Sequence, residues 1–386
     1  MSGEDMRSLV VAMDARLVVY RRGMGTFIYN LLFSMAELSH EFSLLLYVDD
    51  PQAARFVPRD SRFSVVVLAP KLYPVWEQIS LPLAVARDGV DVLHCPANTA
   101  PLRLPSRVKL VLTIHDVMYL LPGSVLPASP SLYQRLGRQY RRCVVPPAAR
   151  RAAAVITDSQ HSGRDIETHL GLPMDKVRVI YGAANAACGE ISEASLLSSV
   201  RMRYGLDRPF LLALAAVDPR KNTGRIIEAY SRFRQKEIGK YQLVLVGLTP
   251  SGQVPFRKLA QALGVADEVI MAGFVSEEDL VALYNAAEML VYPSLYEGFG
   301  LPVLEAMACG TPVITSPTGS LPEVAADAAL MVNPLDVDEI AGAMQHLASD
   351  AVQRQDLIAK GHAQVKKFSW RQAAIETLKV YESVLR

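Results

Sequence analysis

The sequence predicts an α/β fold with two Rossmann-like domains, each a parallel sheet wrapped by helices. Short apolar runs alternate with helical patterns along the chain, which is typical of parallel strands joined by helices. The chain has 386 residues, of which 51% are apolar, and this is enough for two cores. The alternation is interrupted near residues 181–195, where small and polar residues follow one another without periodicity and predict an interdomain linker.

The first domain is predicted to cover residues 1–185. A helix is expected from about Met24 to Leu38, because apolar residues recur there at helical spacing. Seven apolar runs have the length and composition of strands: 9–13, 42–47, 63–68, 91–94, 109–114, 153–157 and 177–181.

The second domain is predicted to cover residues 186–367, beginning with a helix near 196–204. Ser276 is expected to cap the helix that follows it. Asp336 and Asp338 could bind a metal-linked diphosphate, but they precede a long helix, where capping is the expected role. A last helix is expected from Trp370 to Leu385, within residues 368–386. Six strands are predicted: 210–217, 242–246, 268–271, 289–292, 312–315 and 329–331.

Composition argues against several classes of protein. The net charge is +1, so no global field would attract nucleic acid. Acidic residues precede a short apolar run at the N-terminus, which does not fit a secretory signal, and no run approaches the ~20 apolar residues of a spanning helix. We expect free thiols in a reducing cytosol and no metal site, because the cysteines lack metal-ligand spacing: Cys95, Cys143, Cys188 and Cys309.

The most informative stretch is 292–316, YPSLYEGFGLPVLEAMACGTPVITS. It leaves an apolar strand, crosses a loop that contains Glu297 and enters a short helix that Pro302 can open and Gly310 can close. A helix N-terminus offers unpaired N–H groups and about half a positive charge, which suits a phosphate or a sugar hydroxyl. Glu305, placed in the first turn of this helix, would suit a ligand site or simple capping of the helix.

A second candidate site is DPRKN, residues 218–222, between a strand and a helix. Arg220 can bind a diphosphate through a forked contact, and Lys221 can bind it as a point charge. Both side chains oppose the dipole of the following helix, which favours a ligand over a structural reason for their presence.

Two further features lie in the first domain. His115 and Asp116 follow the strand 109–114, and ligands of open sheets bind at the carboxyl ends of strands, although the pair could equally cap the loop. Gly23 and Gly25 could let the backbone approach a ligand. Ile28 stands where a dinucleotide fingerprint requires its third glycine, which argues against a nicotinamide site.

Arginines also recur at helical spacing, at Arg135, Arg138 and Arg142. Such a row usually forms a solvated surface. Contact with an anionic acceptor or with lipid headgroups is the alternative.

The stretch 292–316 resembles the donor-sugar signature of the retaining glycosyltransferases of family four, and the resemblance extends over most of the chain. It implies the GT-B fold, in which two Rossmann-like domains with parallel sheets face each other across a cleft. The first domain would bind the acceptor and the second the nucleotide-sugar. The terminal helix, 368–386, would cross back to the first domain.

The resemblance also implies roles for individual residues. Glu297 would lie near the reacting sugar and stabilise its positive charge in the transition state, and His115, with Asp116 beside it, would face the donor sugar. Gly23 and Gly25 would belong to a loop on the cleft opposite the donor.

The remaining implied residues bind the donor. Arg220 and Lys221 would hold the diphosphate without a metal, and Glu305 would accept hydrogen bonds from the ribose. Backbone groups of three residues would hold the sugar hydroxyls: Phe299, Gly300 and Leu301.

These roles predict a retaining, metal-independent hexosyltransferase without a cofactor that acts on a glycan or lipid-linked acceptor in polysaccharide synthesis. The sequence of residues 319–324, GSLPEV, resembles that of bacterial mannosyltransferases and favours GDP-mannose as the donor. We expect a cytoplasmic protein, with the arginine row as a candidate for peripheral contact with the membrane. The alternatives are a UDP-sugar donor, a sugar-nucleotide epimerase or phosphorylase on the same fold, and a non-catalytic nucleotide-sugar-binding partner.

Overall fold

A computed structural model describes residues 9–20, 23–39, 43–123, 132–236 and 241–386. The chain forms two compact units. Unit 1 consists of Met1–Leu120, Leu136–Gly182 and Ser369–Arg386, and unit 2 consists of Leu121–Arg135 and Ala183–Phe368. The terminal segment therefore belongs to the first unit.

Unit 1 contains a seven-stranded sheet in the order β3-β2-β1-β4-β5-β6-β7, in which every neighbouring pair is parallel. Residues 11–13 of β1 are fully buried, because helices cover both faces of the sheet, and this explains the continuous apolar runs in the sequence. All seven predicted strands are confirmed: β1 (Val10–Asp14), β2 (Ser43–Val48), β3 (Phe63–Val67), β4 (Val92–Cys95), β5 (Lys109–Thr113), β6 (Ala154–Thr157) and β7 (Val177–Val179).

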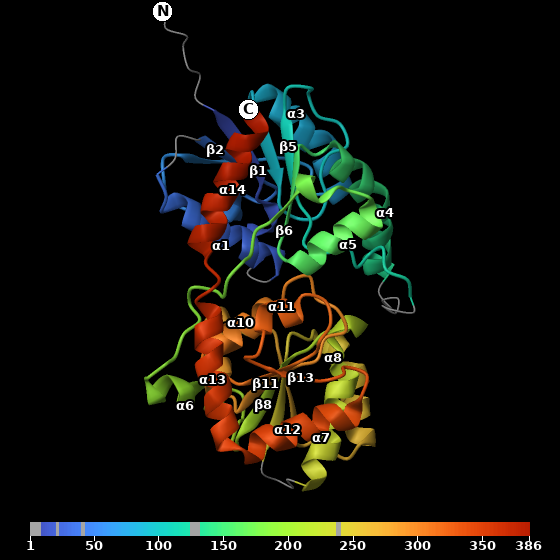
Figure 1. The fold of residues 1–386 in the computed structure, drawn as a ribbon, viewed down its shortest axis with the longest axis vertical. Helices are drawn as coiled ribbons and strands as arrows, with labels where there is room; N and C mark the ends of the chain where they lie inside the picture. The colour runs from blue at the N-terminus through green and yellow to red at the C-terminus, as the bar shows by residue number, and fades with distance from the viewer. Residues whose placement is uncertain (1–8, 21–22, 40–42, 124–131, 237–240) are drawn as a thin grey trace, which may run out of the picture. The chain divides into compact units, whose positions relative to one another are not determined.

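The helices of unit 1 include the first predicted helix and the last. They lie side by side in Figure 1. The Phe27 ring of the first helix packs edge-on against the Trp370 ring of the last, with 5.5 Å between the ring centres. Tyr381 anchors the last helix to the sheet, since its hydroxyl lies 2.7 Å from Nδ1 of the buried His94. The helices are α1 (Met24–Ala36), α2 (Tyr73–Val75), α3 (Leu81–Arg87), α4 (Leu132–Arg151), α5 (Gln160–Leu170) and α14 (Trp370–Leu385), with the short turns η1 (Arg16–Val19), η2 (Pro51–Phe56), η3 (Trp76–Ser80) and η4 (Met174–Lys176). The first four residues of α4, 132–135, fall in unit 2.

Unit 2 contains a six-stranded parallel sheet in the order β10-β9-β8-β11-β12-β13. The six predicted strands are confirmed, although the first ends at Leu214 rather than near residue 217. They are β8 (Phe210–Leu214), β9 (Gln242–Val246), β10 (Val269–Gly273), β11 (Met289–Tyr292), β12 (Val313–Thr315) and β13 (Leu330–Met331).

The helix caps predicted in unit 2 are also confirmed. The Ser276 hydroxyl accepts a hydrogen bond from the backbone N–H of Asp279, and the Asp336 carboxylate accepts from the N–H groups of Asp338 and Glu339. Asp336 therefore has the capping role expected of it. The helices are α6 (Ala194–Arg203), η5 (Pro219–Lys221), α7 (Thr223–Lys236), α8 (Pro250–Ala262), α9 (Glu277–Ala286), α10 (Leu301–Ala308), α11 (Leu321–Ala325), α12 (Val337–Ser349) and α13 (Ala351–Val365).

The strand order of both sheets reverses at a defined point. In unit 1 the order turns back between β1 and β4, and in unit 2 it turns back between β8 and β11. The connections leave such neighbouring strands in opposite directions, which opens a crevice at their carboxyl ends where α/β proteins bind ligands. Ligand sites are therefore expected at these two points.

Candidate active site

The Glu297 loop, residues 293–300, follows β11 at the reversal point of unit 2. Ser320 fixes this loop, because its backbone N–H and its hydroxyl both lie 3.1 Å from the carbonyl oxygen of Glu297. Gly319 packs against the same backbone: a Cβ at this position would lie 2.5 Å from the Glu297 carbonyl oxygen, so only glycine fits. The loop is held by its neighbours before any ligand binds.

The turn that carries Arg220 and Lys221 follows β8, the neighbour of β11. The Asp218 carboxylate caps this turn by accepting from the N–H of Arg220 at 3.0 Å. Asn222 takes up a left-handed conformation with φ of 59°, and its side-chain amide donates to the carbonyl of Pro293 at 3.0 Å. The turn and the Glu297 loop are thereby joined into one structure.

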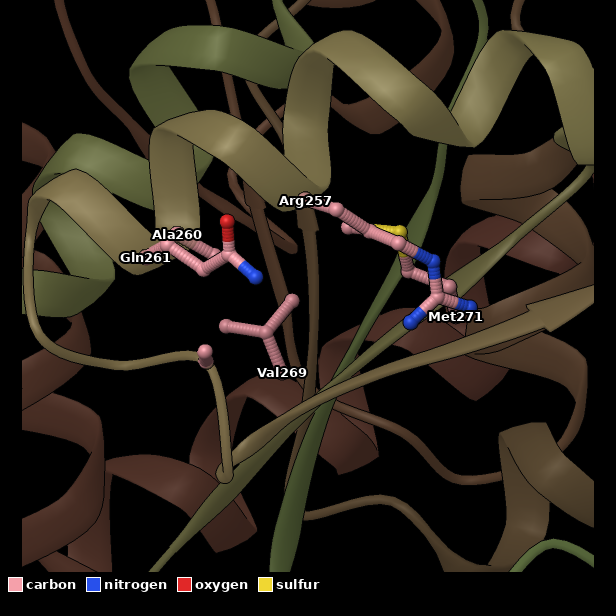
Figure 2. A pocket seen from close by; sticks show the side chains of 6 residues that line it. Arg257, Ala260, Gln261, Val269 and Met271 are labelled. Atoms are coloured by element: carbon pink, nitrogen blue, oxygen red, sulfur yellow. The ribbon is translucent and has the colours of Figure 1, made fainter.

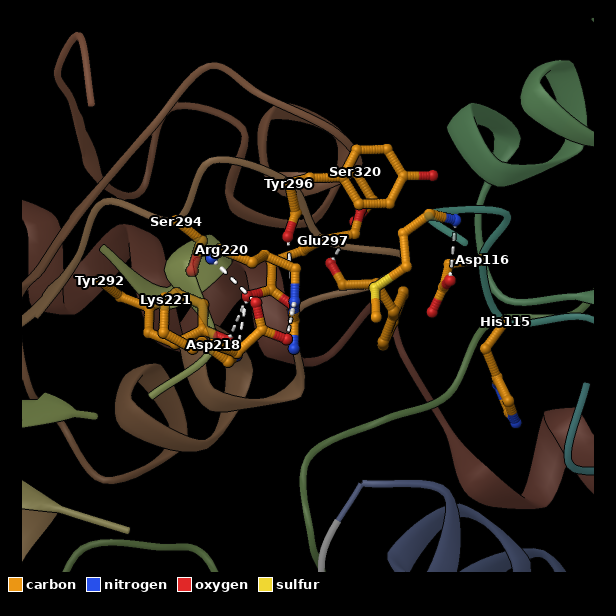
Figure 3. Close-up of polar contacts among 12 residues, drawn as sticks. His115, Asp116, Asp218, Arg220, Lys221, Tyr292, Ser294, Tyr296, Glu297 and Ser320 are labelled. Carbon is orange, nitrogen blue, oxygen red and sulfur yellow. Dashed lines mark hydrogen bonds and ion pairs between the residues drawn. The ribbon is translucent and has the colours of Figure 1, made fainter. Parts of the chain in front are cut away.

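Three polar groups converge on the Glu297 carboxylate (Figure 3). Lys221 Nζ lies 2.7 Å from Oε1, and the Tyr292 hydroxyl donates to the same oxygen at 2.7 Å. Arg220 pairs with the other oxygen, Oε2, through its guanidinium. Lys221 also contacts the Tyr292 hydroxyl, and its ammonium lies 4.5 Å from the centre of that ring. The sequence predicted that Arg220 and Lys221 serve one site with Glu297, and the structure brings them together.

Burial and charge act in opposite directions on this cluster. Burial alone would raise the pKa of Glu297, but the charges of Arg220 and Lys221 outweigh it and lower the pKa from 4.5 to about 2. Burial lowers the pKa of Lys221 from 10.5 to about 8, because the attraction of Glu297 offsets burial and the repulsion of Arg220 only in part. The Glu297 carboxylate therefore stays ionised at neutral pH and is shared between two cations.

Glu305 lies on α10, eight residues after Glu297. The sequence placed it in the first turn of this helix, and that was wrong. α10 begins at Leu301, Pro302 stands in its opening turn as predicted, and Glu305 falls in the second turn. Its carboxylate accepts a hydrogen bond from the Tyr284 hydroxyl at 3.1 Å, and burial raises its pKa to about 7. Glu305 is therefore poised to change its charge near neutral pH.

The start of α10 completes the site in unit 2. Gly300 is its N-cap, with φ of 114°, and a Cβ there would lie 2.9 Å from a Leu321 side-chain methyl group. Leu301 is the first helical residue, and the carbonyl of Phe299 accepts from the Ser320 hydroxyl at 2.5 Å. The positive end of the helix dipole thus lies at the same end of the sheet as Glu297.

His115 and Asp116 follow β5 in unit 1. The ring of His115 is held on both sides: Nδ1 lies 2.5 Å from the Asp158 carboxylate, and Nε2 lies 2.8 Å from the carbonyl of Pro96. Burial opposes the charged imidazole, but Asp158 outweighs it and the pKa is raised. Asp116 accepts from the N–H of Met118 at 3.0 Å, so it does cap the loop. The structure shows that both ring nitrogens hold His115 in one orientation. Its role toward the donor stays a prediction.

Gly23 and Gly25 lie at the start of α1 in unit 1. Gly23 is the N-cap, with φ of 54°. Close packing requires glycine at position 25, because a Cβ there would lie 1.7 Å from the carbonyl oxygen of Tyr20. A residue other than glycine would displace this turn whether or not a ligand binds beside it.

The predicted arginine row lies on α4. Arg138 and Arg142 each donate through Nε to the carbonyl of Tyr119, at 3.0 and 2.8 Å, so two of the three guanidiniums hold the helix to that turn. Arg135 is exposed. Within the described residues, no helix is long and apolar enough to cross a membrane.

The cysteines are free thiols, as predicted. Cys95 and Cys309 are buried, whereas Cys143 is exposed. Among the residues that the structure describes, His, Cys, Asp and Glu side chains form no group of three that could hold a metal ion.

One small pocket lies on unit 2 between α8 and β10 (Figure 2). Its volume is about 50 Å³, and it is lined by residues such as Arg257, Gln261 and Met271. None of the predicted site residues lines it, and it is too small for a nucleotide, whose sites usually measure about 300 Å³ or more. We assign it no role in binding the donor.

Comparison with known proteins identifies the family. The family described as Glycosyltransferase Family 4 matches residues 21–187, and the family described as Glycosyl transferases group 1 matches residues 202–364. O-antigen chain mannosyltransferase B of Escherichia coli is 32% identical over 298 residues, which cover 77% of this chain and 75% of that protein. The chain belongs to glycosyltransferase family 4.

Two further similarities qualify this result. The serotype-specific mannosyltransferase WbdA of Escherichia coli is 36% identical over 227 residues, which are 58% of this chain but only 28% of WbdA. Sucrose-phosphate synthase from Thermosynechococcus elongatus shares the fold with a TM-score of 0.77 and 22% identity, covering 97% of this chain and 99% of that one. The predicted GT-B class of two Rossmann-like units is confirmed.

Sequence reasoning missed three contributors to the site. Tyr292 was read only as the end of a strand, although its hydroxyl contacts both Lys221 and Glu297. Asn222, in the quoted motif, was given no role. Ser320 was noted only as part of the segment 319–324. A polar residue at the end of an apolar strand was a signal for Tyr292, whereas the contacts of Ser320 depend on tertiary structure.

Proposed function

We propose that this protein transfers mannose from GDP-mannose to a glycan or lipid-linked acceptor, with retention of anomeric configuration and without a metal ion. The observation that carries the proposal is the convergence of Arg220 and Lys221 on Glu297 at the reversal point of unit 2, beside the start of α10. A cationic turn and a helix N-terminus at the carboxyl ends of parallel strands suit the diphosphate of a nucleotide-sugar.

The chemistry assigns a task to each group. The bond between the anomeric carbon and the diphosphate oxygen breaks, and the electron pair leaves with the diphosphate. Arg220, Lys221 and the N–H groups at the start of α10 stabilise that negative charge, which is the task a metal ion would otherwise perform. The acceptor hydroxyl attacks from the face that the diphosphate leaves, and its proton passes to an oxygen of the leaving group. This route retains the configuration.

The two carboxylates have separate tasks in this proposal. Glu297 is ionised at neutral pH because its pKa is about 2, so it can stabilise positive charge on the sugar ring. Glu305 accepts hydrogen bonds from the ribose hydroxyls. Its pKa of about 7 means that donor binding and its ionisation are coupled.

Donor binding also requires an exchange of partners. In the structure, Glu297 already occupies both Arg220 and Lys221. The diphosphate has to replace this carboxylate on the two cations, and the same movement releases Glu297 toward the sugar. Binding of the diphosphate to Arg220 and Lys221 would therefore free the Glu297 carboxylate to act on the sugar.

The choice of mannose is supported by relatives whose names describe mannosyltransferases, two of them quoted above from Escherichia coli. A UDP-sugar is the alternative donor. A cytoplasmic location at the inner face of the membrane, with α4 as the contact, also belongs to the proposal. Leu132 and Leu136 are 68% and 63% exposed on that helix and Arg135 is exposed, so apolar and basic side chains are both available to anionic lipid.

The decisive experiment offers a panel of nucleotide sugars together with a crude extract of lipid-linked glycans and measures release of nucleoside diphosphate. GDP-mannose should give the fastest release, the product should be an α-mannoside by NMR, and a chelator should not change the rate. Lys221→Ala should weaken both binding and turnover, since the diphosphate loses one of its cations. Faster release from a UDP-sugar would overturn the donor, and no release from any sugar would overturn the transferase itself.

Membrane contact needs its own measurement. Sedimentation with phosphatidylglycerol vesicles should bring down the protein at low salt, and Arg135→Ala should reduce the bound fraction. Equal binding to neutral phosphatidylcholine vesicles, or none to either, would remove this part of the proposal.

A further inference from the structure

A buried guanidinium lies at the reversal point of unit 1. Arg16 follows β1 by two residues, and the backbone of Pro96–Thr99 follows β4, the strand beside it. Arg16 is only 9% exposed, and its Nε has no hydrogen-bond partner within the described residues. Its guanidinium instead lies 3.8 Å from the centre of the Tyr73 ring and 5.2 Å from that of Trp76.

The neighbouring carboxylates do not supply the missing bond. Asp14 accepts from the backbone N–H of Arg16 at 3.1 Å and acts on the guanidinium by charge, as do Glu77 and Asp49. Glu77 is fully buried, and its carboxylate is occupied by other donors. They are the Tyr73 hydroxyl at 2.6 Å, the Thr99 hydroxyl at 2.5 Å, the Gln78 amide at 2.7 Å and the Tyr140 hydroxyl at 2.5 Å.

The backbone beside Arg16 is unusual as well. Residues 76–80, the segment η3, form a π-helical turn, in which the N–H of Leu81 bonds to the carbonyl of Trp76. The wider turn lets the consecutive residues Trp76 and Glu77 both reach the interior, where each is 0% exposed. Such turns occur often at functional sites, and a buried donor without a partner is costly unless a ligand completes it.

We propose that Arg16, Asp14 and Tyr73 form the subsite of unit 1 that binds a neutral sugar unit of the acceptor, an inference that rests on the proposed function. Arg16 Nε donates to a sugar oxygen, Asp14 accepts from a hydroxyl, and the partly exposed Tyr73 ring packs against the sugar. A guanidinium, a carboxylate and an aromatic ring are the groups that a hydroxyl-rich ring with an apolar face requires.

Charge decides against a phosphate at this position. Among the described residues, the three carboxylates of Asp14, Asp49 and Glu77 all act on the Arg16 guanidinium, so a dianion would meet net repulsion from them. Burial raises the pKa of Asp14 to about 6 in spite of the attraction of Arg16, which is a further sign that additional negative charge is disfavoured here. A neutral hydroxyl can use the Arg16 donor without adding charge.

The test measures binding of octyl glycosides to the full chain by saturation-transfer NMR and calorimetry, with octyl α-D-mannoside, α-D-glucoside and β-D-galactoside as probes. Wild type should bind at least one of them. Arg16→Lys keeps the charge but loses the forked donor, and it should weaken that glycoside by about tenfold or more while the affinity for GDP is unchanged. Asp14→Asn should weaken it as well, and it replaces Arg16→Lys if that variant does not fold.

Arg62→Lys is the matched control. Arg62 lies in unit 1, and its guanidinium is hydrogen-bonded within the chain to Asp60 and to the carbonyls of Ala36 and Leu38. Its loss should lower stability and leave glycoside binding unchanged. Binding of no glycoside by wild type, or equal binding by wild type and both site variants, overturns the inference. Release of diphosphate from the donor is measured separately, so a failed subsite is distinguished from a failed function.

Discussion

Replacing Glu297 by glutamine tests the exchange of anions at the donor site. The variant keeps the size of the side chain and removes the charge that Arg220 and Lys221 share. If the diphosphate must displace this carboxylate, Glu297→Gln should bind GDP more tightly than wild type and still transfer sugar more slowly.

The size of the effect follows from the pKa of Glu297. A fall from 4.5 to about 2, at roughly 1.4 kcal/mol per unit, means that the site favours the ionised carboxylate by about 3 kcal/mol. Because the folded-state pKa is lowered, this stability is present above pH 4.5 and is lost as the pH falls toward 2. About 3 kcal/mol sets an upper limit of roughly 100-fold on the gain in GDP affinity, and we expect about tenfold or more.

Calorimetric titration with GDP at pH 7.5 measures the affinity, and thermal unfolding of the free protein measures the cost. Unfolding should occur at a lower temperature in the free variant, because two buried cations lose their partner. Glu268→Gln is the matched control: Glu268 is equally buried in unit 2 and pairs with Arg234 at 2.9 Å. It should lose stability without any gain in GDP affinity. Unchanged or weaker binding of GDP by Glu297→Gln would refute the exchange.

Three further predictions concern the same site. The affinity for GDP should fall as the pH rises through about 8, because Lys221 loses its proton there. Calorimetric titrations at pH 7 and 9 should show this fall in wild type and not in Lys221→Arg. An equal fall in both proteins would contradict this role of Lys221. The pKa of Glu305 is raised to about 7, so its contribution to the free energy of unfolding should decrease as the pH rises from 4.5 to 7. Between pH 5.5 and 8, Glu305→Gln should therefore lose less thermal stability than wild type. Tyr292→Phe should lower the free energy of unfolding by about 1–2 kcal/mol, because Glu297 loses a donor at 2.7 Å; an unchanged urea midpoint would show that this hydroxyl is dispensable.

The sequence was sufficient for the secondary structure because its signals are local. Strands such as β4, β9 and β11 are apolar runs buried on both faces, and such runs stand out whatever their partners are. Ser276 and Asp336 were predicted as caps from their position before a helical pattern, and a cap bonds only to its own helix. Glu305 was predicted in the first turn of α10 but lies in the second, because the helix already begins at Leu301, after its N-cap Gly300.

The resemblance implied that Arg220 and Lys221 share one donor site with Glu297. The structure gives a physical reason for their meeting, because each motif follows a strand and neighbouring parallel strands end at one edge of the sheet. Sequence could not predict that the two cations already hold Glu297. It also gave no sign that both ring nitrogens of His115 are occupied or that Arg16 is buried beside Tyr73.

The order of apolar runs, loop glycines and capping residues by itself determined two parallel-sheet units and the loops that carry the candidate site, since these depend on neighbours within a few residues. Only the tertiary structure decided which charged groups lie close together. Glu297 and Lys221 are 76 residues apart, and Arg16 and Glu77 are 61 residues apart. Side chains so distant in sequence are brought together by strand order, and their protonation then depends on burial that no local pattern records.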